Sequence, residues 1–177
     1  MPEREAYVAG HAWLSPNPLT IDVVTTMTDS GSTQMPRDFL SAYHSAMVST
    51  LPEQEVEKFR IRLGARLLQP FIDSLDGTQL PLPELKAKLE TYLRDELQMA
   101  ESATVTEENG KLFVDIKGCH LCFGNDRLRA QGKPGFCPFA PGINRAVSKA
   151  LGQSGRLEGV DKSPGVTGEC TIRYQVG

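Results

Sequence analysis

The stretch at residues 103–116, ATVTEENGKLFVDI, decides the fold class that the sequence predicts. Apolar and polar side chains alternate on both sides of the Asn109-Gly110 pair, as they do in two strands that each bury one face. An Asn-Gly pair readily adopts the left-handed backbone angles of a type I′ turn. We therefore predict a β-hairpin here, and the elements on either side of it set the rest of the fold.

Three amphipathic helices are predicted before the hairpin. The first begins near Pro36, because proline is tolerated in the first turn of a helix and apolar residues follow at three- and four-residue spacing. The second begins near Pro52 and carries an apolar stripe as far as Leu75, with Pro70 expected to kink its end. The third begins at Pro83 and places leucines four residues apart. Such stripes are stable only against another layer, so we expect the helices to pack on a sheet.

A further helix and a second hairpin are predicted towards the C-terminus. Residues 142–151 place their apolar side chains on one face, and Gly152 follows where it suits a helix C-cap. Two strand-like segments, 156–161 and 170–176, flank the turn residues Ser163-Pro164-Gly165. The order favours an α+β domain over residues 36–177, with N-terminal helices packed on an antiparallel sheet of two hairpins and an intervening helix. Residues 1–35 are predicted to form an irregular arm.

Composition excludes several classes of protein. The 177 residues are 40% hydrophobic and 23% charged, which is typical of one globular domain. A formal net charge of −3 argues against a dedicated nucleic-acid binder, which would carry a dominant basic stripe. No apolar stretch approaches the roughly 20 residues that span a bilayer, and the first residues lack the pattern of a signal peptide. We therefore expect a soluble cytoplasmic protein without a membrane span or a nucleic-acid partner.

Charge and cysteine are both unevenly distributed. Residues 1–118 hold 11 basic and 18 acidic side chains, whereas residues 119–177 hold 8 and 4. The change falls at the first cysteine, and all four cysteines lie in the basic part. In a reducing compartment, four thiols are more often metal ligands or redox groups than disulfides. The chemistry is therefore expected in the C-terminal third.

The spacing of the cysteines predicts a metal site. Cys119 and Cys122 form a C-x-x-C pair flanked by glycines, GCHLCFG, which resembles a tight metal-binding turn, and Cys137 and Cys170 complete four thiols. Four thiolates satisfy a tetrahedral zinc ion. The same ligands also suit an iron–sulfur cluster, and spacing alone does not separate the two. His120, inside the turn, could replace one thiolate.

Two other interpretations of the cysteines stay open. A C-x-x-C pair also occurs in thioredoxin-type redox proteins, but there it lies at a strand-to-helix junction of a βαβ unit, which this sequence does not show. Alternatively, Cys137 and Cys170 are small core residues and only the pair is reactive.

Candidate ligand-binding residues are less specific. Aromatic side chains of the predicted helices could wall an apolar pocket, or could simply form the core. Arg127 and Arg129 form a basic group after the C-x-x-C pair, which fits a solvated loop better than an anion clamp. No catalytic residue is nominated, because the chain lacks a phosphate-binding glycine loop and a nucleophile elbow. The candidate wall residues are Phe39, Tyr43, Phe59, Phe71 and Tyr92.

The C-terminal third carries a resemblance to a known family. CPFAPG at 137–142 opens a helix, and GECTIRY at 168–174 opens the last strand. With the preceding helices and hairpin, residues 36–176 resemble the 4-vinyl-reductase domain family, which includes hydrocarbon-binding proteins. The resemblance implies an α+β domain, commonly dimeric, with a small hydrophobic pocket under the helices and often a bound zinc. The C-x-x-C pair is not universal in that family, and its sensor members use a carboxylate as one ligand.

These observations lead to a functional hypothesis. We expect a metal-stabilised domain that binds a small hydrophobic molecule, such as a tetrapyrrole, an aromatic compound or a hydrocarbon, as a sensor or carrier rather than an enzyme. The alternative is an iron–sulfur redox protein or a tetrapyrrole-related reductase that uses the same cysteines, and a third is an assembly protein without a ligand. Apolar helix surface left after the core is filled predicts a homodimer.

Overall fold

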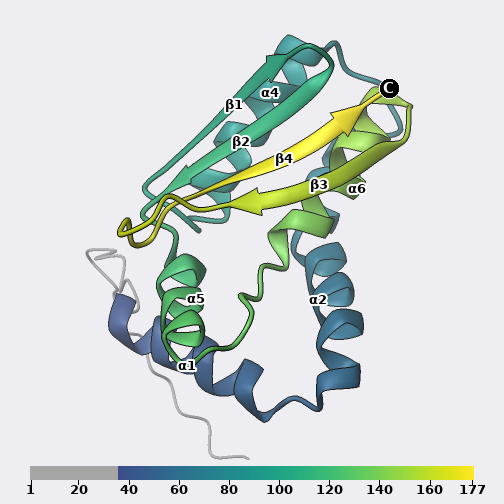
Figure 1. Cartoon of the computed structure of the whole chain (residues 1–177). Coiled ribbons are helices and arrows are strands. Elements are labelled where there is room, and N and C mark those ends of the chain that lie inside the picture. Colours follow the sequence, from purple (N-terminus) through teal and green to yellow (C-terminus); the bar gives the residue numbers. More distant parts are fainter. Residues whose placement is uncertain (1–35) are drawn as a thin grey trace, which may run out of the picture. The chain divides into compact units, whose positions relative to one another are not determined.

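A four-stranded antiparallel sheet is the centre of the part of the chain that the computed structural model describes, residues 36–177 (Figure 1). The predicted arm, residues 1–35, lies outside the described residues. The strands run in the order β1-β2-β4-β3, where β1 is Ser102–Glu108, β2 is Lys111–Lys117, β3 is Gly155–Asp161 and β4 is Cys170–Val176. The two predicted hairpins therefore meet through β2 and β4, and the α+β class is confirmed.

The Asn109-Gly110 turn joins β1 and β2 as the sequence predicts. Both residues have left-handed angles, with φ of 52° and 75°. The turn sets a register in which Val105 lies opposite Val114, and the second hairpin adds Tyr174 opposite Leu112 on the other side of β2. Because these residues share one face, their pairing places apolar side chains on the side that the helices cover.

The helices depart from the predicted pattern in two places. The predicted second helix is broken at Leu68, and Pro70 lies in the first turn of a separate short helix rather than at a kink. Residues 120–130, which we predicted as a loop, are helical. The helices are α1 (Arg37–Thr50), α2 (Glu53–Leu67), α3 (Gln69–Ser74), α4 (Leu82–Thr91), the π-helical turn η1 (Tyr92–Glu96), α5 (His120–Ala130) and α6 (Phe139–Leu151).

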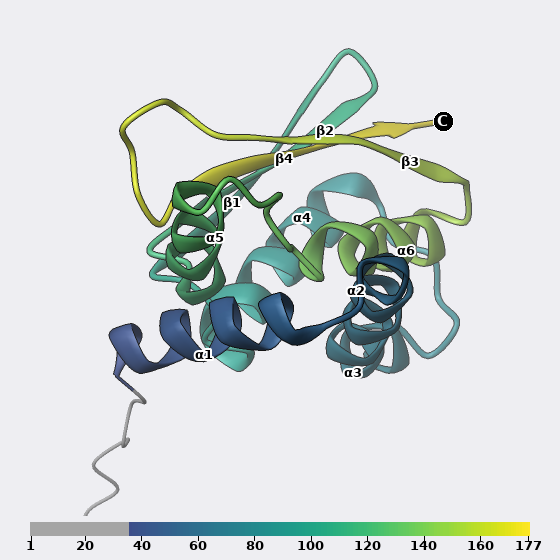
Figure 2. The same ribbon diagram turned by 60° about the horizontal axis from the view of Figure 1, so that its bottom comes forward.

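The main core lies between one face of the sheet and the helices α4 and α6 (Figure 2). Ile143 and Val147 of α6 and Leu85 and Leu89 of α4 are fully buried in it. The Tyr174 hydroxyl donates a hydrogen bond to the Ala140 carbonyl at 3.0 Å, which fixes β4 against the start of α6. Among residues 36–177, no helix has the length and apolar character needed to cross a bilayer.

Two glycines set the crossing of α2 and α6. A Cβ on Gly64 would lie 2.1 Å from the Pro138 carbonyl oxygen, and a Cβ on Gly142 would lie 2.6 Å from the Gly64 oxygen. No side chain fits at either position, so the two backbones touch. This contact fixes the segment that enters α6, in which Cys137 immediately precedes Pro138.

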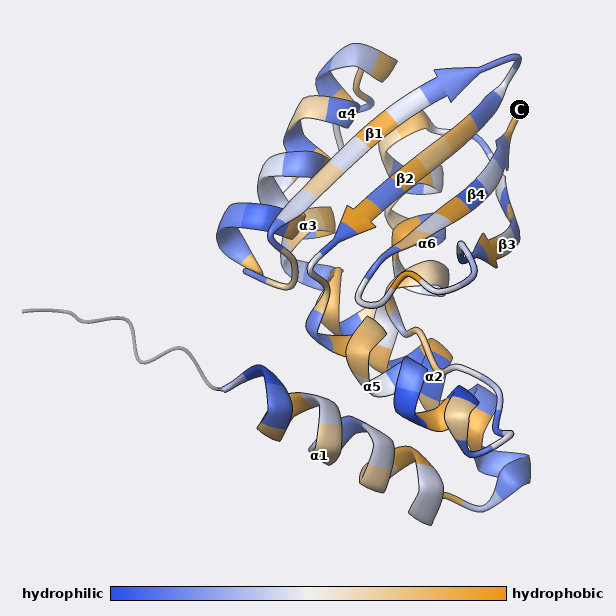
Figure 3. Ribbon diagram, turned by 60° about the vertical axis from the view of Figure 1, so that its left-hand side comes forward, coloured by the Kyte–Doolittle hydropathy of each residue, from blue (hydrophilic) through white to orange (hydrophobic). Residues whose placement is uncertain are grey.

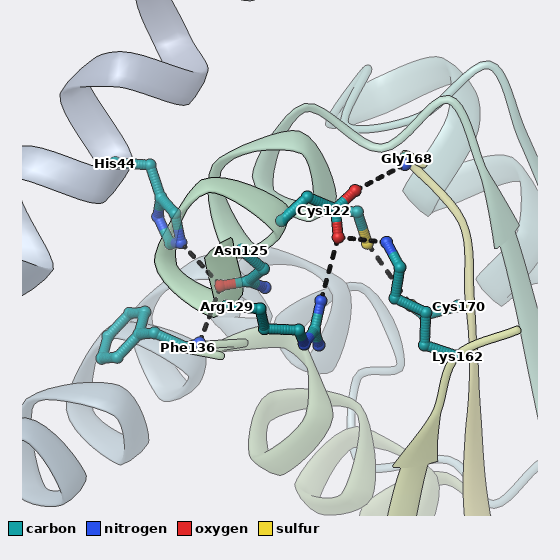
Figure 4. A network of polar contacts seen from close by, with 9 residues as sticks. His44, Cys122, Asn125, Arg129, Phe136, Lys162, Gly168 and Cys170 are labelled. Carbon is teal, nitrogen blue, oxygen red and sulfur yellow. Dashed lines mark hydrogen bonds and ion pairs between the residues drawn. The ribbon is translucent and has the colours of Figure 1, made fainter. Parts of the chain in front are cut away.

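A polar contact joins α1 to α5. The His44 side chain is 2% exposed, and its Nε2 lies 3.0 Å from Asn125 Oδ1. The same oxygen accepts the Phe136 backbone N–H at 2.7 Å, so Nε2 of His44 is the donor (Figure 4). Gly124 lets the helices approach, because a Cβ there would lie 2.5 Å from the His44 ring. Burial lowers the pKa of His44 below its usual value of 6.5, and the bond to Asn125 only partly offsets that effect.

We expect the His44 contact to make stability depend on pH. Because the folded-state pKa is lowered, unfolded chains bind more protons as the pH falls through about 6.5, and the folded state loses stability. The free energy of unfolding should fall between pH about 7.5 and 5.5, by no more than about 1.4 kcal/mol for this single group, measured by urea titration. His44→Gln keeps a neutral donor and should flatten this dependence. An equal slope in the variant would show that another group titrates.

Candidate functional site

The four cysteines come from three segments of the chain and meet at one end of the sheet. Cys119 is the N-cap residue of α5, two residues after the end of β2, and Cys122 lies in the first turn of that helix. Cys137 precedes α6 by two residues, and Cys170 is the first residue of β4. The strand register explains the convergence, because Ile116 near the end of β2 pairs with Cys170 at the start of β4.

The thiols form a connected group. The sulfur atoms of Cys122 and Cys170 lie 3.5 Å apart (Figure 4). Cys119 is hydrogen-bonded to Cys122, and it also lies near enough to Cys137 to act on its charge. All four are free thiols, with Cys119 and Cys122 buried and the other two half-buried. The convergence that the sequence predicted is therefore present as a cluster of four sulfur atoms.

Mutual proximity and burial hold the thiols of Cys119, Cys122 and Cys137 in the neutral form. The hydrogen bond to Cys122 and then burial raise the pKa of Cys119 well above its usual value. The bond from Cys119 lowers the pKa of Cys122, but its bond to Cys170 and its burial outweigh this and raise the pKa. Burial, followed by the charge of Cys119, raises the pKa of Cys137 to about 11. Four thiolates would therefore repel one another here unless a cation neutralised them.

Backbone amides point at two of the sulfur atoms. The Leu121 and Cys122 N–H groups at the start of α5 bond to the Cys119 sulfur. The Phe139 and Ala140 N–H groups at the start of α6 bond to the Cys137 sulfur in the same way. Helix N-termini favour negative charge, so both positions suit a thiolate. One set of amides therefore lies at the C-x-x-C pair and the second at the start of α6.

Two further polar groups border the cluster. The guanidinium of Arg60 lowers the pKa of Cys137, because its positive charge favours the thiolate. His120 follows Cys119, and its Nδ1 is buried with no hydrogen-bond partner among residues 36–177. A buried polar atom without a hydrogen bond lowers the stability of the folded state, so such an atom is expected to have a bonding partner. His120 therefore stays a candidate ligand beside the thiols.

The donor set fits a single metal ion by its chemistry and by one distance. As placed, no group of three or more His, Cys, Asp and Glu side chains within residues 36–177 is arranged to hold an ion. The four thiols therefore lie near one another, but their sulfur atoms do not surround a common point at metal-ligand distance. Tetrahedral zinc with bonds of about 2.3 Å separates its sulfur ligands by about 3.8 Å, close to the 3.5 Å between Cys122 and Cys170. In a four-iron cluster each thiolate binds a different iron, which spreads the sulfur atoms further.

Asp126 holds the loop that precedes Cys170, a role that no sequence pattern indicated. Its carboxylate accepts hydrogen bonds from Lys162, from Arg129 at 3.1 Å and from the Gly168 backbone N–H at 3.1 Å (Figure 4). The Cys119 N–H donates to the Gly168 carbonyl at 2.9 Å, which ties the same loop to the N-terminus of α5. An acidic side chain four residues after a C-x-x-C pair would have suggested the role only if 120–130 had been recognised as a helix.

The comparisons with known proteins identify no family. No protein-family model matches the chain, and no curated protein matches it. One similar solved structure is the crystal structure of trafficking protein particle complex subunit 3 from Naegleria fowleri, covalently bound to palmitic acid. The identity is 14%, the match covers 80% of this chain and 95% of that chain, and the TM-score is 0.48. A likeness at this level carries no argument about function.

The structure does not bring the five candidate wall residues together. Phe39 and Tyr43 are exposed on α1 and stack on each other. Phe59 stacks on Phe136 in a small cluster between α1, α2 and α5. Phe71 and Tyr92 pack together in the main core, at 5.3 Å between ring centroids. These residues therefore lie in three places rather than around one pocket.

The candidate arginines are engaged by carboxylates. Arg127 lies 3.9 Å from Asp38, and Arg129 pairs with Asp126 at 3.1 Å. Both side chains are more than a third exposed, as the solvated interpretation expects. Neither reaches a cavity described below.

Three of the cavities in residues 36–177 are large enough to compare with the candidate site, and their linings are polar or mixed. One of about 990 Å³ lies between the end of α3 and the end of α6, and its lining includes Asp73, Arg145 and Lys149. One of about 330 Å³ adjoins Cys170. One of about 410 Å³ is bordered by Phe71 and by α4 residues. The largest of the three lies apart from the cysteines, so its size gives no reason to place the chemistry there.

Proposed function

We propose that residues 36–177 form a zinc-binding module in which one ion is held by Cys119, Cys122, Cys137 and Cys170. The observation that supports the proposal most directly is that four thiols from three segments of the chain meet, with the Cys122 and Cys170 sulfur atoms 3.5 Å apart. Zinc would supply the positive charge that lets these buried thiols ionise. The ion would then tie together the end of β2, the helices α5 and α6, and the start of β4.

The residues around the thiols support the same proposal. The amides at the starts of α5 and α6 favour thiolates at Cys119 and Cys137, and the Arg60 charge adds to the second. The short sulfur–sulfur distance favours a single ion over a four-iron cluster, and an iron–sulfur cluster in which two thiolates share one iron stays the alternative. The role is structural, because four protein ligands leave no open position for a substrate.

The hydrophobic-ligand hypothesis is kept as a second part of the proposal. It rests on the resemblance to the 4-vinyl-reductase domain family, and the cavity of about 410 Å³ beside Phe71 is the candidate place. A domain with a structural metal and a bound apolar molecule would act as a sensor or carrier rather than as an enzyme.

Native mass spectrometry of the full chain, expressed with zinc and iron and purified without chelator, tests the proposal. We expect one zinc per chain in a colourless protein. Bound iron together with absorbance in the visible range would show that the cysteines hold an iron–sulfur cluster instead of zinc. A reduced protein that takes up neither metal on titration would overturn the metal site.

Single-residue variants identify the ligands in the same measurement. Cys122→Ser should lose the zinc, because its sulfur lies at ligand distance from that of Cys170. His120→Asn should keep it if four thiolates bind. Loss of zinc from the His120 variant, together with retention in one of the cysteine variants, would put the imidazole in the ligand set. The same spectra test the hydrophobic-ligand hypothesis separately. A bound small molecule, seen as additional mass that organic solvent removes while the zinc is retained, would support it.

A further inference from the structure

The four thiols differ in their access to solvent. Cys119 and Cys122 are 3% and 5% exposed, whereas Cys137 and Cys170 are half-buried. Figure 3 shows hydrophobic colours along the first part of α5, where Cys122 lies. Cys170 instead borders the cavity of about 330 Å³, and neither of the other two cavities described above is bordered by a cysteine. A small molecule from the solvent therefore reaches Cys170 before it reaches the buried pair.

The cavity beside Cys170 suits a small, neutral and polar reagent. Its wall carries three carboxylates and two amines, so it favours neither a cation nor an anion strongly. Hydrogen peroxide is neutral, is little larger than water, and both donates and accepts hydrogen bonds. The charged residues of the wall are Asp115, Lys117, Asp161, Lys162 and Glu169.

We propose that Cys170 is an oxidation site that reacts with hydrogen peroxide and then forms a disulfide with Cys122. The second thiol is already in place, because the Cys122 and Cys170 sulfur atoms lie 3.5 Å apart (Figure 4). Burial keeps the reagent away from Cys122, so each thiol has a separate role. The pair joins two distant segments of the chain and differs from the C-x-x-C pair that the sequence singles out.

The reaction has two steps that balance. The Cys170 sulfur attacks one oxygen of the peroxide, the O–O bond breaks, and the products are a sulfenic acid and water. The Cys122 sulfur then attacks the Cys170 sulfur, the S–O bond breaks, and a second water leaves. In total the two thiols lose two electrons and two protons, and one peroxide becomes two waters. A dithiol reductant reverses the change by thiol–disulfide exchange.

Oxidation at this pair would also remove two of the four proposed zinc ligands. This consequence rests on the proposed function, whereas the choice of Cys122 and Cys170 rests on the geometry alone. Zinc binds the thiolate form of cysteine, so a disulfide leaves the ion with two ligands and the ion should dissociate. The new bond links residues 48 apart in the chain, which restricts the unfolded state. We expect an oxidised chain that has released its zinc and stays folded.

Peptide mapping of the full chain as purified, reduced and then treated with equimolar hydrogen peroxide, tests the proposal. We expect the peptides that contain Cys122 and Cys170 to be joined, with fragmentation separating Cys122 from Cys119. A chromogenic indicator should register zinc at the rate at which the disulfide forms, and a dithiol should restore the thiols. In urea, which removes the contact between the two segments, Cys119 and Cys122 should pair instead, because they close the shortest loop.

Variants assign the two roles. Cys170→Ser should slow the loss of thiols by about tenfold or more, because the remaining thiols are less accessible. Cys122→Ser should leave a sulfenic acid on Cys170 that dimedone labels. Cys137→Ser is the matched control, because it removes one proposed zinc ligand but should still form the disulfide. The wild-type map identifies the pair even where a variant fails to fold.

Two results would overturn the proposal. One is a folded wild-type chain whose first disulfide joins Cys119 to Cys122, or that forms none. The other is a Cys170→Ser variant that loses thiols at the wild-type rate. In either case the zinc content of the untreated chain still reports on the metal site. Conversely, a disulfide between Cys122 and Cys170 in a chain that holds no zinc would support the oxidation site and contradict the proposed function.

Discussion

Replacing Cys137 by serine is expected to lower the free energy of unfolding by about 4 kcal/mol in buffer that holds free zinc a thousandfold above its dissociation constant. The folded chain binds the ion and the unfolded chain does so weakly, so loss of one ligand removes the linkage energy. Cys137 is the informative position because amides at the start of α6 already favour its thiolate. Urea titration with and without a strong chelator measures the effect.

The chelator provides the main control for this prediction. With zinc removed, wild type and Cys137→Ser should unfold at nearly the same urea concentration. Val48→Ala is a matched control in a different cluster, because it loses packing energy but should keep one zinc per chain. If the chelator leaves the wild-type midpoint unchanged, the cysteines do not form a structural metal site, and the redox and core interpretations gain.

Gly64→Ala is expected to cost about 3 kcal/mol of stability, although alanine is normally the better helix former. The new methyl group would lie 2.1 Å from the Pro138 carbonyl oxygen and 3.0 Å from the Gly142 nitrogen. Backbone atoms cannot rotate aside as a flexible side chain can, so α2 and α6 must separate. Thermal and urea unfolding of the variant measure the loss.

Gly159→Ala is the matched control for Gly64→Ala. Its Cβ would meet only the Arg173 guanidinium, at 3.4 Å, and stability should change by less than about 1 kcal/mol. Because Cys137 precedes Pro138, the Gly64 variant should also bind zinc more weakly than the control. Equal stability of the two variants would show that the backbones of α2 and α6 lie further apart at Gly64 than the structure places them.

The sheet was the most predictable part of the fold. Asn109-Gly110 and the alternation around it are local signals, and a turn type fixes a register without help from distant residues. The α+β class followed from the order of such signals along the chain. The pairing of β2 with β4 was not specified by any local pattern, because it depends on how the two hairpins meet.

The sequence analysis did not predict helix α5, because its residues carry signals for both a turn and a helix. Gly124 and the surrounding glycines favour a turn, whereas Cys122, Asn125 and Leu128 are spaced as a buried helical face. The glycine is required by the close approach of His44, which only the assembled structure shows. With α5 unrecognised, the role of Asp126 could not be found.

The candidate site was predictable to different degrees. Cysteine spacing carries its own chemistry, so the four thiols could be chosen without knowing the fold. Aromatic residues carry no such information, because Phe71 in the core and Phe39 on the surface occupy similar positions in helical stripes. Which stripe faces the sheet is decided by tertiary packing.

The pairing of β2 with β4 also orders the events of folding. Each hairpin closes locally and quickly, whereas their union brings Leu112 to Tyr174 across the intervening helices and must overcome a larger loop-closure entropy. The same step brings Ile116 to Cys170, so the thiols meet only when the sheet is complete. Changes in the Asn109-Gly110 turn should therefore act mainly on the refolding rate. The bound ion should act mainly on the unfolding rate and so set the lifetime of the folded chain.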